Sequence, residues 1–340
     1  MASPSGSLSR RALLRSAAGA ATMPLGLLGT RAWAAPPPAA SLKPVKFAWN
    51  SGGACLSPVA LAVKEGLFKK HGIDVELINY SGSTDQLLES LATGKADAAV
   101  GMALRWIKPL EQGFDVKLVG GTHGGCQRLL GDRNAGITTD LHSLKGKIIG
   151  TTDLGGPDKN FFSIMMQKQG IDPFKDVEWR QYPGDLLPLA VEKGEIQAIS
   201  FYDPLTWVFL KRYPNLFEVA TNLSGEYANR LCCLIGVRGS LIRQDRPLAG
   251  QIMQALHEAQ DLTYADPRLA AEAYLPYSAK TSVEDLVSIL KSHTHGHHPG
   301  GIAFRQELVL YAEELRGVNV LKANTDPQKF ADRIYADVLS

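Results

Sequence analysis

Two stretches of this chain show the same succession of residue types ~100 residues apart, and this repeat limits the possible folds more than any other feature. The first, residues 72–94, begins Gly-Ile-Asp, continues with an alternating apolar and polar run, and ends on an amphipathic stretch. The second, residues 170–194, follows the same plan. The spacing is far longer than a solenoid period of ~20–50 residues. The sequence therefore predicts two lobes built alike, with the functional site in a cleft between them.

The first 34 residues have the parts of an export signal. The arginine pair at 10–11 resembles the twin-arginine type, a small apolar run covers 17–28, and Ala-Trp-Ala ends at Ala34. The apolar part is shorter than the ~20 residues of a membrane span, so we favour a signal over an anchor. We expect removal of residues 1–34, a Pro- and Ala-rich spacer at 35–44, and a mature protein in the periplasm.

Composition indicates a small partner. The formal net charge is only +2, with Lys and Arg spread among Asp and Glu, so neither a nucleic-acid surface nor a polybasic membrane patch is expected. Hydrophobic residues make up 45% of the chain, enough for the cores of two domains. Four cysteines are too few for a disulfide scaffold. We expect no cofactor.

Strands alternate with helices along the chain, which predicts the α/β class with a mainly parallel sheet flanked by helices in each lobe. Examples are a short strand at 46–49 and a helix at 158–169. We place lobe 1 at 45–130 plus 238–340 and lobe 2 at 131–237. The last part is mostly helical, and we expect these helices to pack on lobe 1. The helices are predicted at 246–265, 267–275, 281–291 and 302–315.

Small and polar residues follow the predicted strands, where the ligand sites of parallel sheets lie. Glycine lets a ligand approach the backbone, and Ser or Thr adds a hydroxyl, so such ends suit an anion or a dipole. The segments are 50–54, 82–84, 101–103, 151–157, 183–185 and 201–204.

Residues 60–76, 91–98 and 144–150 carry a resemblance to a known family. In order and spacing they resemble the periplasmic substrate-binding proteins of ABC importers, in the nitrate, sulfonate and taurine branch that includes thiamine-pyrimidine-precursor relatives. The resemblance implies the two-lobed type II periplasmic binding protein fold, hinged by crossover strands near 126–132 and 231–237. It also implies a monomer that closes on a small-molecule solute and docks on a membrane permease.

The resemblance places the family's ligand loops at particular residues of this chain. They are Asn50, Ser51, Gly82, Ser83, Gly101, Met102, Thr122, His123, Thr152, Asp153, Tyr202 and Asp203. The chain departs from a simple sulfonate or nitrate site in having His123 and Cys126 at one crossover and Cys232 and Cys233 at the other. The solute, its affinity and the cognate permease stay open.

If the two crossovers are adjacent, His123, Cys126 and one of Cys232 and Cys233 converge. Three such soft ligands would suit zinc or copper, whereas two neighbouring thiols would form a hinge disulfide, in which Cys126 has two candidate partners. We favour packed thiols with His123 as a polar contact in the cleft, and hence no metal site.

A run of histidines, His293, His295, His297 and His298, also attracts attention. The run lacks the i, i+4 spacing of a zinc-binding helix, and Gly296 and Pro299 indicate a loop. We expect an exposed loop, or one that dips toward the cleft, rather than a dedicated metal site.

Four carboxylates near loop ends resemble catalytic groups, but none is paired with a nucleophile at a recognisable spacing, and the common catalytic motifs are missing from the sequence. They are Asp153, Asp158, Asp185 and Asp203. We interpret them as helix caps or ligand-orienting groups. Arg105 and Trp106 are expected either to reach a solute or to lie on a helix surface.

The sequence thus predicts a non-enzymatic receptor for a small polar solute, anionic or zwitterionic, such as a sulfonate, nitrate or a taurine-like molecule. Aromatic side chains are expected to stack on its organic part. The candidates are Trp49, Trp106, Phe201 and Tyr202. Two alternatives remain: an enzyme like the thiamine-pyrimidine-precursor synthases, and a receptor for a metal or metal complex.

Overall fold

The computed structural model describes residues 41–80, 84–278 and 280–340. The predicted export signal, most of the spacer, and the predicted ligand residues Gly82 and Ser83 lie outside the described residues. Among the residues that are described, no helix has both the length and the apolar character needed to cross a bilayer.

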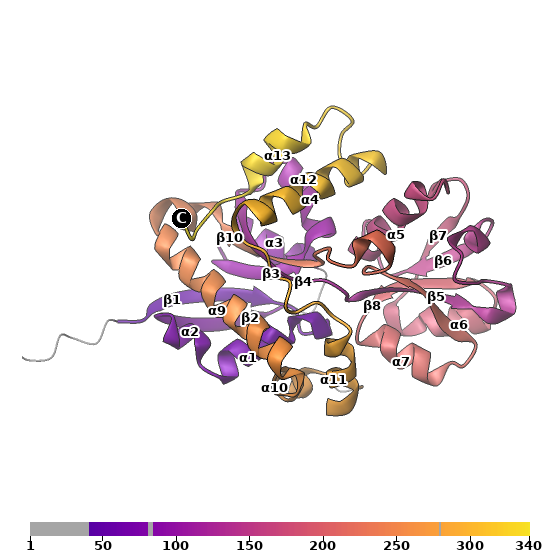
Figure 1. Cartoon of the computed structure of the whole chain (residues 1–340), viewed down its shortest axis with the longest axis horizontal. Helices are drawn as coiled ribbons and strands as arrows, with labels where there is room; N and C mark the ends of the chain where they lie inside the picture. The colour runs from indigo at the N-terminus through magenta and orange to yellow at the C-terminus, as the bar shows by residue number, and fades with distance from the viewer. Residues whose placement is uncertain (1–40, 81–83, 279) are drawn as a thin grey trace, which may run out of the picture. The chain divides into compact units, whose positions relative to one another are not determined.

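The first sheet has five strands in the order β2-β1-β3-β10-β4 (Figure 1). Its strands are β1 (Lys43–Trp49), β2 (Ile73–Asn79), β3 (Ala98–Met102), β4 (Val116–His123) and β10 (Cys233–Arg238). β1 runs parallel to β2 and β3, and β10 runs antiparallel to β3 and β4. All of β3 is buried, because helices cover both faces of a sheet of this kind.

The second sheet repeats the first, in the order β7-β6-β8-β5-β9. Its strands are β5 (Gln127–Asp132), β6 (Ile148–Thr151), β7 (Glu178–Gln181), β8 (Ala198–Tyr202) and β9 (Leu216–Thr221). β6 is parallel to β7 and β8, and β5 is antiparallel to β8 and β9. The predicted fold class, two mixed and mainly parallel sheets flanked by helices, is confirmed.

The helices that precede residue 213 flank these sheets. They are α1 (Ser57–Lys64), α2 (Leu67–Lys70), α3 (Thr84–Ala92), α4 (Ala103–Glu111), α5 (Pro157–Lys168), α6 (Leu187–Glu192) and α7 (Leu205–Arg212). α5 begins one residue before the predicted helix, with a proline in its first turn, where the missing N–H costs no hydrogen bond. Its apolar face lies in the core, as its spacing predicts: Phe161, Phe162, Met165 and Met166 are all buried.

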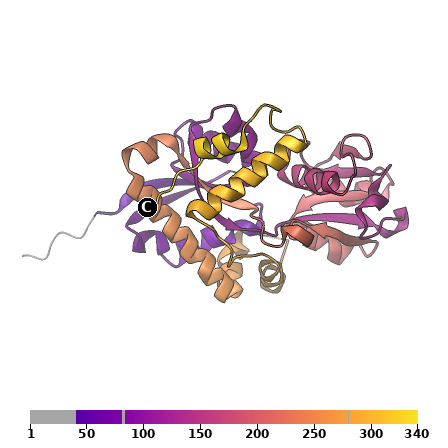
Figure 2. The same cartoon turned by 45° about the horizontal axis from the view of Figure 1, so that its top comes forward.

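The last hundred residues are mostly helical, as predicted. Their helices are α8 (Gly239–Gln244), α9 (Arg246–Ala265), α10 (Pro267–Tyr274), α11 (Val283–Lys291), α12 (Gly301–Gly317) and α13 (Pro327–Ile334). α9 and α10 pack on the first sheet's side against α1 and each other, and α11 packs against α10. α12 departs from the expectation, because it touches α4 and β4 and also α5 of the second sheet (Figure 2). Lys168 in α5 pairs with Glu314 in α12 at 2.9 Å.

Two crossovers connect the sheets, and they lie side by side. The chain leaves the first sheet after His123 and returns to it at Cys233. The Cys232 N–H donates to the carbonyl of His123 at 2.7 Å, and a Cβ on Gly124 would lie 2.1 Å from the carbonyl oxygen of Arg230. The close approach of the two backbones explains glycine at position 124.

Sheet membership differs from the predicted division into lobes. Residues up to 130 were assigned to lobe 1, yet β5 pairs wholly within the second sheet, and β10 pairs within the first although residues up to 237 were assigned to lobe 2. The prediction therefore placed each passage of the chain from one sheet to the other roughly one strand too late in the sequence. Local sequence does not show which neighbours a crossover strand will pair with. β1 also begins at Lys43, earlier than the predicted strand at 46–49.

Candidate functional site

A cleft of about 470 Å³ lies at the carboxyl ends of the parallel strands, where the sequence places the ligand site. Its lining comes from both halves of the molecule: Met102, Arg105, Thr152, Asp153, Gly156, Pro157, Asp158, Gln181, Phe201 and Tyr202. A smaller cavity of about 20 Å³, here called the floor cavity, shares Met102 and Tyr202 with it. The rest of its lining is Asn50, Gly53, Cys55, Leu56, Val100, Gly101 and Cys233. The two together form the candidate site.

A larger cavity of about 510 Å³ adjoins the cleft at Arg105. Its lining comes mainly from α3, α4 and α5 and from the loops after α4 and α12; of the described strand-end segments only 151–157 contributes, through Leu154 and Gly155. We therefore assign the site to the cleft, where loops and helix N-termini present backbone N–H groups.

Six of the predicted ligand residues line the cleft or the floor cavity. They are Asn50, Gly101, Met102, Thr152, Asp153 and Tyr202. Whether they bind a solute stays a prediction. Of the four predicted stacking residues, Phe201 and Tyr202 line the cleft, with ring centroids 4.1 Å apart. Trp49 and Trp106 lie in the core, 1% and 0% exposed, where Trp49 meets the Tyr277 ring and the Trp106 indole lies against Gly101 and Gly236 of the first sheet.

Four other predicted ligand residues line neither the cleft nor the floor cavity. The Ser51 hydroxyl accepts from the Asn79 amide at 3.0 Å, and its carbonyl accepts from Tyr274. Thr122 and His123 are fully buried at the end of β4. Asp203 is also fully buried, below the cleft, where its carboxylate pairs with Arg128.

Asp203 belongs to a buried ionic network at the crossovers. Its carboxylate accepts from Nε of Arg128 at 2.9 Å and from the hydroxyl of Thr206 at 2.6 Å. It also lies 3.3 Å from Nε2 of His293. Burial raises the pKa of Asp203, but His293 and the charge of Arg128 outweigh burial and hold it below its usual value. An ionised Asp203 thus balances the buried guanidinium.

An ion pair between the two sheets' elements closes one side of the cleft. Nη1 of Arg105, in α4, lies 2.9 Å from Oδ2 of Asp153, in the loop after β6. The same guanidinium binds Asp85 of α3, with Nε 2.6 Å from Oδ1. Burial lowers the pKa of Arg105, but the surrounding carboxylates raise it above its usual value, so it stays charged. Arg105 therefore lines the cleft, and whether it contacts a solute stays a prediction.

Asp158 is the second carboxylate of the cleft. It lies in the first turn of α5 and is 1% exposed, and its Oδ2 accepts from Thr151 at 3.0 Å and from Ser200 at 2.8 Å. Burial raises its pKa to about 6, although both hydroxyls oppose the shift. Arg105 is the one cation among the described lining residues of the cleft. It already pairs with two carboxylates, Asp153 of the cleft and Asp85 of α3, and Asp158 adds a third acid.

Beneath the floor cavity lies a buried cluster of one imidazole and four free thiols, which we call the thiol cluster. It consists of Cys55, His123, Cys126, Cys232 and Cys233. The predicted convergence of the crossover residues is confirmed in part: the sulfurs of Cys126, Cys232 and Cys233 lie within 4.8 Å of one another, but His123 groups with Cys233 and Cys55 instead of with Cys126. Thiol hydrogen bonds from Cys126 and Cys233 lower the pKa of Cys55 well below its usual value, although burial opposes them.

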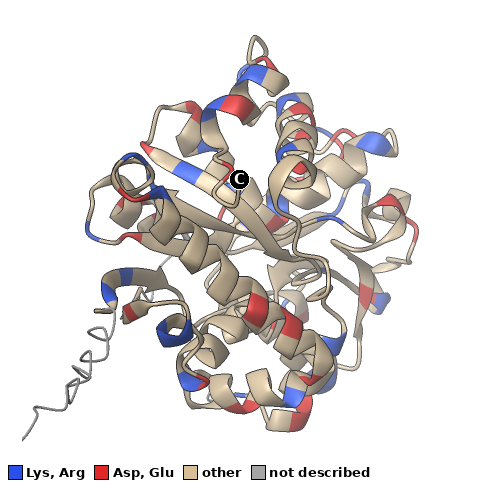
Figure 3. Cartoon of the chain, turned by 60° about the vertical axis from the view of Figure 1, so that its left-hand side comes forward, with Lys and Arg blue, Asp and Glu red and all other residues tan. Residues whose placement is uncertain are grey.

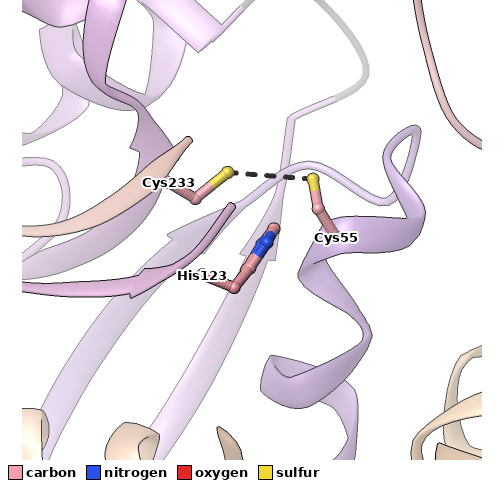
Figure 4. A group of neighbouring side chains, drawn as sticks. All are labelled: Cys55, His123 and Cys233. Carbon is pink, nitrogen blue, oxygen red and sulfur yellow. Dashed lines mark hydrogen bonds between the residues drawn. The ribbon is translucent and has the colours of Figure 1, made fainter. Parts of the chain in front are cut away.

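Cys55 is a member that the sequence analysis missed. It lies in a short 3₁₀ turn, Ala54–Leu56, after β1, one residue beyond the strand-end segment 50–54. Its sulfur lies 3.8 Å from that of Cys233, and both sulfurs and a ring nitrogen of His123 fall within 4.8 Å of one another (Figure 4). Its position just past a strand end was the signal that could have identified it.

The histidine run does not form an exposed loop throughout. His293 and His295 are 6% and 1% exposed; the His293 ring stacks on the His123 ring with centroids 5.5 Å apart, and the His295 ring is tilted to it with centroids 4.9 Å apart. Nδ1 of His295 lies 2.7 Å from the amide oxygen of Gln260. The alternative of a loop dipping inward is therefore the correct one for these two residues. His297 and His298 remain partly exposed.

Comparisons with known proteins agree with this architecture. Residues 55–270 match the model of a family described as NMT1/THI5 like. The 4-amino-5-hydroxymethyl-2-methylpyrimidine phosphate synthase THI13 of Saccharomyces cerevisiae is 32% identical over 236 residues, which are 65% of this chain and 66% of that protein. This chain thus spans just under two thirds of that curated relative's length.

Among solved structures, the periplasmic aliphatic sulphonate binding protein SsuA of Escherichia coli aligns with a TM-score of 0.72 and 15% identity, over 87% of this chain and 93% of that one. The periplasmic nitrate-binding protein NrtA of Synechocystis PCC 6803 aligns with a TM-score of 0.70 and 16% identity, over 86% of each chain. At these identities the likeness concerns the fold alone. The periplasmic binding protein fold inferred from the sequence is thereby confirmed.

Proposed function

Because this chain belongs to the NMT1/THI5-like family, we propose that it is an exported receptor that closes on a small polar solute and delivers it to the permease of an ABC importer. It acts as a monomer in the periplasm. The observation that carries this proposal is the cleft whose lining comes from both sheets' elements and which the Arg105–Asp153 ion pair spans. Contacts made from both sides exist together only when the cleft is closed, so a solute shifts the population toward that state.

The charges of the cleft narrow the class of solute. Arg105 is already balanced by carboxylates, and Asp158 adds a further acid, so a simple anion such as nitrate would find no unshared cation among the described lining residues. A zwitterion fits better, because its ammonium group can face Asp153 and Asp158 while its anionic group takes part of the Arg105 fork. The Phe201 and Tyr202 rings would cover an organic part.

A second candidate is an enzyme acting on a pyrimidine precursor, which the printed name of the yeast relative favours. The described lining of the cleft supports the receptor instead, since it holds acids, hydroxyls and aromatic rings but neither lysine nor histidine. Its acids are held by hydroxyls or by Arg105, an arrangement for orienting a ligand.

A thermal-shift screen of the mature protein tests the proposal. The panel contains taurine, alkanesulfonates, nitrate, amino acids and aminopyrimidines, and a solute that prefers the folded state raises Tm as its concentration grows. We expect a zwitterion to give the largest shift, and mass spectrometry to recover it unchanged after long incubation. Conversion of an aminopyrimidine into a new product would establish the enzyme, and a flat response to every zwitterion would overturn the proposed solute class.

A further inference from the structure

The thiol cluster has the geometry of a metal site. Two metal–sulfur bonds of ~2.3 Å that meet at the tetrahedral angle hold their sulfurs ~3.8 Å apart. The Cys55 and Cys233 sulfurs lie 3.8 Å apart, and a nitrogen of His123 lies within 4.8 Å of both. Figure 4 shows the three side chains converging from three separate elements.

His123 is held in the tautomer that a metal ligand needs. Its Nδ1 lies 3.1 Å from the carbonyl oxygen of Gly124, so Nδ1–H donates and the lone pair is on Nε2. That Nε2 is buried and has no hydrogen-bond acceptor or donor partner among the described residues. A backbone carbonyl that fixes one ring nitrogen while the other faces an ion is the usual support of a histidine ligand.

Rigid elements position the three ligands. Cys233 and His123 are register partners in the antiparallel pair of β10 and β4, where β4 is an edge strand of the first sheet and β10 is its neighbour. Cys55 lies in the turn that leads directly into α1. Their exposed fractions are 2% or less, so the site would be prebuilt and shielded from bulk water.

The floor cavity lies against two of these ligands. Cys55 and Cys233 both line it, and its volume of about 20 Å³ accommodates about one water molecule. Two thiolates and one imidazole with an open fourth position form a donor set that zinc uses in proteins. Two thiolates also neutralise a divalent ion, which removes the cost of burying either charge alone.

We propose that Cys55, His123 and Cys233 bind one zinc ion at the base of the solute cleft, with a water in the fourth position facing the floor cavity. Cys126 and Cys232 are neighbours of this site and not ligands. Their sulfurs form a separate group with Cys233, which makes them matched controls for the ligand cysteines. The proposal goes beyond solute binding and does not depend on it.

The test uses the full chain purified from its export compartment. Metal content is measured by mass spectrometry, and the chelator-stripped protein is titrated with Zn²⁺ against a chromophoric competitor and with Co²⁺ in a spectrophotometer. We expect one zinc per chain and a thiolate-to-cobalt band typical of two sulfur ligands. Cys55→Ala and His123→Ala remove a ligand and should weaken zinc binding by more than about a hundredfold, whereas Cys126→Ala removes only a hydrogen-bond partner of a ligand and should weaken it by about tenfold.

The cobalt spectrum of the wild type reports the sulfur ligands without any substitution, so the proposal can be tested even if a variant fails to fold. A folded wild-type chain with no metal and four titratable thiols would overturn the proposal, as would a disulfide found in place of the thiols. Zinc affinity that survives Cys55→Ala but falls with Cys126→Ala would place the ion on the other thiol group and equally overturn the assignment. Occupancy by copper alone would overturn the choice of zinc. The thermal-shift screen on the same sample reports solute binding separately.

Discussion

The carboxylate of Asp203, at the end of the second sheet's central strand, lies 3.3 Å from Nε2 of His293, which follows α11 on the first sheet's side. Both side chains are fully buried. The contact brings together residues 90 positions apart and joins the two halves of the molecule beside the crossovers. Arg128, 6% exposed, completes the network.

Replacing Asp203 should destabilise the protein strongly. Asp203→Asn leaves the Arg128 guanidinium buried without its main counter-charge, and breaking a buried pair in this way costs about 3 kcal/mol or more. Urea unfolding at neutral pH measures the change in the free energy of unfolding. Asp261→Asn is the matched control, because Asp261 pairs with His298 but its side chain is 69% exposed. Equal effects of the two substitutions would show that the network is not structural.

The Arg105–Asp153 pair should hold the cleft shut in the absence of solute. Asp153→Asn removes the cross-cleft charge, so we expect a larger radius of gyration by small-angle scattering and a stability change below about 1 kcal/mol, since Asp153 is 37% exposed. Added salt should move the wild type toward the variant. Asp140→Asn, at a 67% exposed carboxylate that is not among the cleft lining residues, is the control. A radius that is the same for all three proteins at every salt concentration would contradict this role.

Asp158 should make stability depend on pH in an unusual direction. Its folded pKa of about 6 lies above the unfolded value of ~3.9, so the folded state binds the proton more tightly. The stability that comes from protonated Asp158 is complete below the unfolded pKa and is lost as pH rises through the folded pKa. Relative to Asp158→Asn, the wild type should lose about 2 kcal/mol between pH 4 and 7.

Urea unfolding of both proteins across this range measures the difference. The subtraction removes the contributions of all other titrating groups that the substitution leaves unchanged. Parallel profiles would show that Asp158 has an ordinary pKa in the folded protein.

Gly101 should not tolerate a methyl group. A Cβ at this position would lie 2.0 Å from Cζ2 of Trp106, and the indole is fully buried. Gly101→Ala therefore forces the ring or β3 to move, at a cost of about 3 kcal/mol. Gly300→Ala is the control, because its Cβ would meet only the flexible end of Met253. Thermal unfolding of the two variants measures the loss of stability in each. If Gly300→Ala lost as much stability as Gly101→Ala, the clash with Trp106 would not explain the effect.

Much of the architecture follows from the sequence. The repeated units and the alternation of strands and helices predict two similar sheets, and α5, α9 and α10 begin within one residue of their predicted positions. The even spread of charge is also as the sequence indicates, with basic and acidic segments interspersed in Figure 3. These features depend on residues close together in the chain, whose periodicity and capping select the local structure.

The site was predictable only in part. Thr152, Asp153 and Tyr202 line the cleft because they follow parallel strands, and that position can be read from local pattern. Ser51 and Asp203 follow strands too, but their side chains bind Asn79 and Arg128 instead. Which way a strand-end side chain points is decided by partners elsewhere in the chain.

The order of residues by itself determined two similar α/β halves, a set of strand-end loops and the helical last part, because each depends on interactions within a few turns of chain. Only the tertiary structure decided that β5 and β10 join opposite sheets and that Cys55 meets His123 and Cys233. It also decided that His293 and His295 are buried. These outcomes depend on strand pairing and core packing between distant segments, and a local pattern carries no information about either.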